Sequence, residues 1–137
     1  MSTEAIEKTL SANDTGETGG HQAGILVPKE RSILSFFPEL TTDRKNPRAV
    51  LDMLDDTARE WTFRFIYYNN RFFGGTRNEY RLTGMTAFLR EFNLKEGDKV
   101  IMRRESPRRI RITFQRAYEQ DGVLRLSSGW KVIDTEF

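Results

Sequence analysis

Alternation of apolar and polar positions predicts that most of this chain forms β-strands. Between residues 60 and 69, Trp61, Phe63 and Phe65 occupy every second position. In 99–104 and 109–115 charged residues alternate with apolar ones, a pattern typical of antiparallel strands with one solvated face. Together with shorter apolar or β-branched runs, the pattern predicts seven strands, at 24–28, 48–54, 60–69, 78–82, 99–104, 109–115 and 123–126.

Two short helices are predicted between these strands. Residues 29–37 carry apolar side chains at helical spacing and are followed by Pro38, and residues 86–92 predict a helix of about two turns. Residues 1–24 are polar and glycine-rich, which predicts a loop or an extended arm. Because no βαβ rhythm is present, the fold class is mainly β with two short helices (α+β), a small barrel or sandwich.

Length and composition narrow the classes of function. The 137 residues fit a single domain, 1–137, and the absence of cysteine argues against disulfides, thiolate nucleophiles and the common zinc sites. The single histidine, His21, argues against a histidine-rich metal site, so we expect no metal and no cofactor. The apolar runs are too short to span a membrane, and the N-terminal segment has no secretory pattern. We therefore expect a cytoplasmic protein with no membrane partner.

The charge is concentrated in the middle of the chain. Residues 71–116 carry 12 basic and 5 acidic side chains, and ten of the basic ones are arginine. The planar guanidinium group pairs well with phosphates and with guanine. The middle block therefore predicts a nucleic-acid partner.

Catalytic groupings are weak by comparison. His21 lies in a glycine-rich segment, and the chain has no serine elbow to which it could act as a base. Asp43, Lys45 and Asp98 could form a metal-dependent nuclease site, but they fall at turn signals. We keep a compact metal nuclease as an alternative and expect no catalytic residue here.

Residues 76–82 carry the most specific signal. In an extended chain, Arg77, Glu79 and Arg81 would lie on one face. Arginine pairs with the O6 and N7 of guanine, and glutamate accepts from the N4 amino group of cytosine, so this row could read G·C pairs in a major groove. Glu79 could instead hold the two arginines in register, and the whole row could be a surface salt-bridge ladder.

The segments around this row carry further polar groups. Asn69, Asn70 and Arg71 precede it, and the Phe72–Phe73 pair beside two glycines is expected to anchor a protruding loop to the core. Residues 11–22 supply hydroxyl, amide and imidazole groups that could reach bases or backbone. We expect two DNA-contacting segments.

Several strings of residues resemble a known family. The chain closely resembles the N-terminal effector domain of EcoRII-type restriction endonucleases. The resemblance lies in residues 10–16, 18–22, 66–69, Arg71, 73–74 and 76–79. Residues 27–28 and the block 82–100 are also similar to the pseudobarrel DNA-binding domain of plant auxin-response factors, to which that effector domain is related.

This resemblance implies a seven-stranded open pseudobarrel that grips the major groove between an N-terminal arm, about 8–24, and a C-terminal arm, about 69–82, at a CCWGG-type site. Gly75 and Tyr80 depart from the family pattern, which has lysines there. The expected base-reading residues are Arg77, Glu79, Arg81, His21, Gln22, Asn13 and Asn78. The expected backbone-contacting residues are Lys8, Ser11, Thr15, Asn70, Arg71, Thr76 and Tyr80.

The resemblance further implies a longer natural protein, with a catalytic nuclease domain C-terminal to this one. The domain alone would then bind double-stranded DNA without cleaving it, as a monomer. A transcription-regulator domain reading another short site would share the same fold. A protein-interaction barrel, whose arginines meet an acidic partner, is a further alternative.

Overall fold

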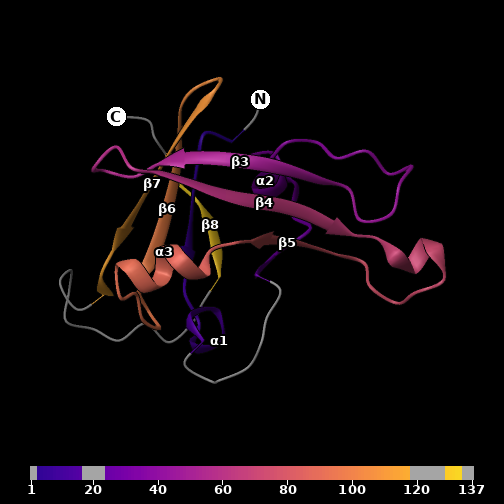
Figure 1. Ribbon diagram of the computed structural model, residues 1–137, viewed down its shortest axis with the longest axis horizontal. Helices are drawn as coiled ribbons and strands as arrows, with labels where there is room; N and C mark the ends of the chain where they lie inside the picture. The colour runs from indigo at the N-terminus through magenta and orange to yellow at the C-terminus, as the bar shows by residue number, and fades with distance from the viewer. Residues whose placement is uncertain (1–2, 17–23, 118–128, 134–137) are drawn as a thin grey trace.

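The computed structural model describes residues 3–16, 24–117 and 129–133, and its main feature is one strongly bent sheet of eight strands. The strand order is β2-β5-β4-β3-β7-β6-β1-β8 (Figure 1). The strands are β1 Ala5–Thr9, β2 Ile25–Val27, β3 Arg48–Leu54, β4 Glu60–Tyr68, β5 Glu79–Thr83, β6 Lys99–Ser106, β7 Arg109–Gln115 and β8 Trp130–Val132.

The sheet consists of two antiparallel halves joined in parallel. Met53 and Leu54 of β3 pair with Ile110 and Arg111 of β7, and this is the only parallel pairing among the described strands. At the opposite side, the Trp130 Nε1–H of β8 donates to the Leu26 carbonyl of β2 over 2.8 Å. Because β2 and β8 are the two edge strands, this side-chain hydrogen bond brings the sheet close to a closed barrel.

Alternation along the strands builds the core. In β4, Trp61, Phe63 and Phe65 are buried, while Thr62 and Arg64 face outward. The rings of Trp61 and Phe63 pack against Phe88 of helix α3, Thr86–Glu91, and the buried side chains of both halves of the sheet form one core. The buried centre also contains Ile6, Leu10, Ile33, Phe36, Met53, Leu82, Phe88, Met102 and Ile112.

The helical segments are short. None of the helices in the described part of the chain is long and apolar enough to cross a membrane. The helix expected at 29–37 is confined to a single turn, and the helix expected at 86–92 is confirmed. The helical segments are α1 Ala12–Thr15, α2 Arg31–Leu34, η1 Asn70–Phe73, a 3-10 turn, and α3 Thr86–Glu91.

The structure corrects the prediction for the N-terminal segment, which was expected to be a loop or arm throughout. Residues 5–9 form β1, between β6 and β8, and residues 12–15 form α1. The mainly β pseudobarrel fold is confirmed, but the sheet has eight strands and not seven. Six of the predicted strands are confirmed, and the strand expected at 123–126 lies outside the described residues.

Candidate nucleic-acid interface

The Arg77–Glu79–Arg81 row predicted from the sequence is present at the start of β5. The Glu79 Oε1 accepts from the Arg77 Nε–H over 2.9 Å, and its Oε2 accepts from the Arg81 Nη2–H over 3.1 Å. The Arg81 Nη1–H also donates to the Gly24 carbonyl over 3.1 Å. The carboxylate therefore holds two guanidinium groups side by side, and Arg81 links the row to the chain just before β2.

Electrostatics keep Glu79 ionised. Burial alone would raise its pKa, but the hydrogen bonds and positive charges of Arg77 and Arg81 outweigh that effect and lower the pKa below its ordinary value. Arg77 is also fixed from the other side, since its guanidinium carbon lies 3.8 Å from the centre of the Tyr68 ring. The row is thus an ordered group of charges with about a third of the Arg77 side chain exposed.

Asparagines fix the root of the C-terminal arm. Asn69 is buried, and its side chain donates to the Arg44 carbonyl and accepts from the Asn46 N–H. The Asn70 Oδ1 accepts from the Arg77 N–H over 2.6 Å, and the Asn78 Oδ1 accepts from the Tyr67 hydroxyl over 2.5 Å. The side-chain oxygens of Asn70 and Asn78, expected to face DNA, are therefore engaged within the arm.

The tip of the arm contradicts one expectation. Phe72 and Phe73 were expected to anchor the loop in the core, but their side chains are 66% and 45% exposed. The reason is geometric, because η1 and Gly74 carry this turn past the end of β4 and away from the barrel (Figure 1). Arg71 and Thr76, expected to contact the DNA backbone, are exposed on the same loop.

Tyr80 lies on the opposite face of β5 from the charged row. Its ring stacks between those of Tyr67 and Phe65, with centroids 4.4 and 5.4 Å away. Burial and the neighbouring Tyr67 raise the pKa of Tyr80. Tyr80 thus joins the arm to the core, and its expected contact with the DNA backbone stays a prediction.

The described part of the N-terminal arm is a capped helical turn. The Ser11 hydroxyl accepts from the Asp14 N–H, and the Asp14 carboxylate accepts from the Ser11 N–H and pairs with Lys8 at 3.3 Å. Lys8 is only 7% exposed, and the Thr15 hydroxyl donates to the Ala12 carbonyl. Asn13 is exposed. His21 and Gln22, predicted to read bases, lie outside the described residues.

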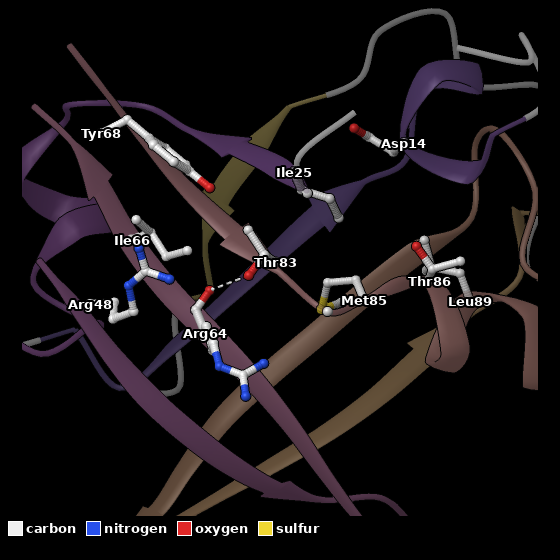
Figure 2. Close-up of a pocket in the computed structure, with 12 residues that line it drawn as sticks. Asp14, Ile25, Arg48, Arg64, Ile66, Tyr68, Thr83, Met85, Thr86 and Leu89 are labelled. Carbon is white, nitrogen blue, oxygen red and sulfur yellow. Dashed lines mark hydrogen bonds between the residues drawn. The ribbon is translucent and has the colours of Figure 1, made fainter. Parts of the chain in front are cut away.

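A groove lies between the N-terminal arm and the outward face of β3 and β4. Figure 2 shows Arg48, Arg64 and Tyr68 on its β3–β4 side and Asp14 of α1 across from them. The sequence patterns did not indicate a binding role for Arg48, Arg64 or Tyr68. Their signal was the alternation itself, since they fall at the outward positions of 48–54 and 60–69. Other groove residues are Ile25, Ile66, Thr83, Met85, Thr86 and Leu89.

The groove and the charged row share one face of the sheet. Arg48 of β3 pairs with Ile66 of β4, which pairs with Arg81 of β5. Residues paired across neighbouring strands point to the same side of a sheet. A patch of four arginines therefore extends from the groove to the C-terminal arm: Arg48, Arg64, Arg77 and Arg81. We call it the arginine face.

The nuclease grouping considered from the sequence is not supported. Among the residues that the structure describes, no three histidine, cysteine, aspartate or glutamate side chains could together hold a metal ion. The Asp98 carboxylate accepts from the backbone N–H groups of Lys95 and Ala117 and so closes a turn. Asp43 lies on the exposed loop before β3.

The fold and the arginine face define a small pseudobarrel domain with a positively charged face suited to nucleic acid. Residues 1–97 match the family model described as "Restriction endonuclease EcoRII, N-terminal". This chain belongs to that family.

Individual relatives agree with this assignment. The Type II restriction enzyme EcoRII of Escherichia coli is 45% identical over 84 residues, which cover 56% of this chain and 19% of that protein. Auxin response factor 3 of Arabidopsis thaliana is 33% identical over 121 residues, covering 88% of this chain and 18% of that protein. The chain thus spans about a fifth of the length of these relatives.

A solved structure has the same fold. The protein chain of an Arabidopsis FUS3–DNA complex superposes with a TM-score of 0.61 at 20% sequence identity, over 81% of this chain and 95% of that one.

Proposed function

We propose that this domain reads a short, G·C-flanked duplex site of the CCWGG type through the major groove, as the effector domain of a restriction endonuclease. The observation that carries the proposal is the Arg77–Glu79–Arg81 row, in which one ionised carboxylate spaces two guanidinium groups. Each arginine matches guanine O6 and N7, and the glutamate can accept from cytosine N4. The likeness to the restriction enzyme EcoRII, of which this chain covers 19%, supports a nuclease domain C-terminal to this one.

The rest of the arginine face suits the phosphate backbone. Arg48 and Arg64 are exposed beside the groove, and neither has an ion-pair partner among the described residues. Phosphate contacts position a protein on the duplex, and base contacts select the sequence. In this proposal the groove residues position the duplex, and the C-terminal arm discriminates between sequences.

The direct test is a binding titration. The domain is titrated by fluorescence anisotropy against a duplex containing CCWGG and a duplex with its outer pairs scrambled, in a metal-free buffer at moderate salt. Preferential binding to the first duplex by 100-fold or more is the expected result. In parallel, sites are selected from random duplexes. Selection of a different short site would replace the CCWGG proposal and favour the transcription-regulator alternative, and equal weak binding to all duplexes would contradict sequence reading altogether.

Truncation of a row arginine sharpens the test. Arg77→Ala is expected to lower affinity for the best site by about 5- to 150-fold, which corresponds to 1–3 kcal/mol, and to relax discrimination at one base pair. The matched control is Arg59→Ala, because Arg59 is an exposed arginine that pairs with Glu91 away from the arginine face. A uniform loss of affinity for every sequence would instead make Arg77 a phosphate contact.

A further inference from the structure

Two exposed phenylalanines at the tip of the C-terminal arm have no role in the row of charges. Phe72 is 66% exposed and Phe73 is 45% exposed, whereas Phe63, Phe65 and Phe88 are buried completely or almost so. Leaving a benzyl group in water forgoes the stabilisation that its burial would contribute. The arm thus presents a large apolar surface that its own fold does not use.

The tip is nevertheless an ordered structure. The Phe72 N–H donates to the Asn69 carbonyl over 3.0 Å, and the Arg71 N–H donates to the Arg77 carbonyl over 2.9 Å. The Gly75 N–H donates to the Asn70 carbonyl, and Gly74 ends η1 in the left-handed conformation. These hydrogen bonds hold the backbone of the turn, so the phenyl rings are carried on a fixed support that needs little further ordering on binding.

The surroundings of the rings indicate which partner they meet. The Arg71 guanidinium carbon lies 6.0 Å from the centre of the Phe72 ring, and Arg77 follows on the same arm. An apolar protein surface would have to desolvate these cations, whereas a nucleic acid offers phosphates to them. The partner therefore combines negative charge with an apolar group.

In a duplex approached from the major groove, the apolar group within reach is the C5 methyl of thymine. Side chains that wedge between base steps enter mainly from the minor groove. The charged row of the C-terminal arm is built for major-groove donors and acceptors, and the rings lie on the loop that leads into that row. A methyl contact fits this approach.

We propose that Phe72, with Phe73 beside it, contacts the C5 methyl group of a thymine within or next to the bound site. The arm then reads G·C pairs by its charges and a T·A pair by its apolar tip. This inference rests on the proposed function, because it assumes that the C-terminal arm enters the major groove.

The experiment replaces thymine by uracil, which removes the methyl group and leaves base pairing intact. Each thymine in the best-binding duplex, and each thymine placed in its flanks, is changed in turn, and affinity is measured by anisotropy. For the unmodified domain, one position is expected to lose about fourfold in affinity, the effect of leaving one methyl group unburied. For Phe72→Ala, the same uracil duplex and its thymine parent are expected to bind equally well.

Two controls keep the result interpretable. Val132→Ala removes an exposed apolar side chain on β8, and it should retain the full uracil effect. Phe72→Leu keeps an apolar group at the tip and should restore part of the effect. Because Phe72 is exposed, Phe72→Ala is expected to unfold at the same temperature as the unmodified domain, which thermal denaturation checks.

The two proposals fail in distinguishable ways. If the unmodified domain does not discriminate between duplexes, the proposed function is wrong. If it discriminates but no uracil position depends on Phe72, the thymine contact is wrong. A rise in 2-aminopurine fluorescence in the complex that disappears in Phe72→Ala would also overturn it, because it would show the ring inserted between unstacked bases.

Discussion

At the scale of single residues, the proposed recognition of bases depends on the row of charges formed by Arg77, Glu79 and Arg81. The alternation of Arg77, Glu79 and Arg81 was readable from the sequence because an extended strand places every second side chain on one face. The sequence left open whether the row is only a surface salt-bridge ladder or contacts the bases of DNA. The structure shows the ladder, since Glu79 forms an ion pair with both arginines. Base reading by the same row stays a prediction.

Glu79→Gln separates the two roles of the carboxylate. The amide keeps an acceptor oxygen but removes a negative charge that repels phosphates, so affinity for scrambled duplex is expected to rise two- to fivefold. The arginines lose their charged partner, so the ratio of specific to scrambled affinity is expected to fall about tenfold. Anisotropy titrations with both duplexes measure the two effects. An unchanged ratio would show that Glu79 has no part in discrimination.

Asp55 determines the acid sensitivity of the fold. Burial alone would raise the pKa of Asp55, but hydrogen bonds from Thr57, Trp61 and Arg59 lower it to about 2 from an ordinary value of 3.8. A carboxyl group whose pKa is lower in the folded state stabilises the fold at neutral pH, by about 2 kcal/mol here, and this contribution is lost as the pH falls from about 5 towards 2.

Asp55→Asn should therefore unfold at lower urea concentration than the unmodified domain at pH 7. The difference between the two is expected to shrink by about 2 kcal/mol at pH 2.5, where the carboxyl group of the unmodified protein is partly protonated. Urea titrations followed by circular dichroism at the two pH values measure it. A difference independent of pH would mean that the Asp55 charge contributes nothing.

At the scale of elements, strands with clean alternation were predictable, and β1 was not. Lys8 occupies an inward position of β1 and is 7% exposed, paired with Asp14 of α1. Sequence patterns treat lysine as exposed, so this ion pair hides the alternation. Similarly, Phe72 and Phe73 were predicted to be buried because the pattern records the residue type and not the turn that carries it outward.

Gly24 connects the N-terminal arm to β2 in a conformation that requires glycine. Its φ is +82°, and a Cβ there would lie 2.3 Å from the Leu82 carbonyl oxygen of β5. Gly24→Ala is expected to destabilise the domain by more than about 2 kcal/mol and to displace the carbonyl that Arg81 contacts. Thermal unfolding measures the first effect and anisotropy the second. Gly16→Ala is the matched control, since Gly16 has the same φ of +82° but a Cβ there has no neighbour within 4 Å, so it measures the cost of the left-handed backbone without the clash.

At the scale of the whole molecule, the arginine face should make DNA binding strongly dependent on salt. Two phosphate contacts, by Arg48 and Arg64, predict a slope of log affinity against log salt of about −2 or steeper. Arg64→Ala should reduce the slope by about 1 and leave the sequence preference unchanged, and Arg59→Ala should change neither. Titrations between 50 and 300 mM salt measure the slope, and a salt-independent affinity would contradict the role of this face.

The overall arrangement was the least predictable level. The residues indicated a small mainly β barrel, but the strand order depends on contacts between distant segments, such as the parallel pairing of β3 with β7. The groove follows from that order, because it needs Arg48, Arg64 and α1 on the same side. Local patterns predict which side chains of a strand point outward. Which of these side chains become neighbours depends on the strand order of the assembled sheet.

The position of β1 in the sheet affects the order of folding during synthesis and the choice of fragments that can fold. Synthesis proceeds from the N-terminus, so Ala5–Thr9 leaves the ribosome before its partners, Lys99–Ser106 and Trp130–Val132. β1 can therefore pair only after β6 and β8 have been synthesised. A fragment cut at residue 97, where the family match ends, would lack β6, β7 and β8 and leave β1 without a neighbour. The stretch that matches the family model is thus shorter than the sheet to which β1 belongs.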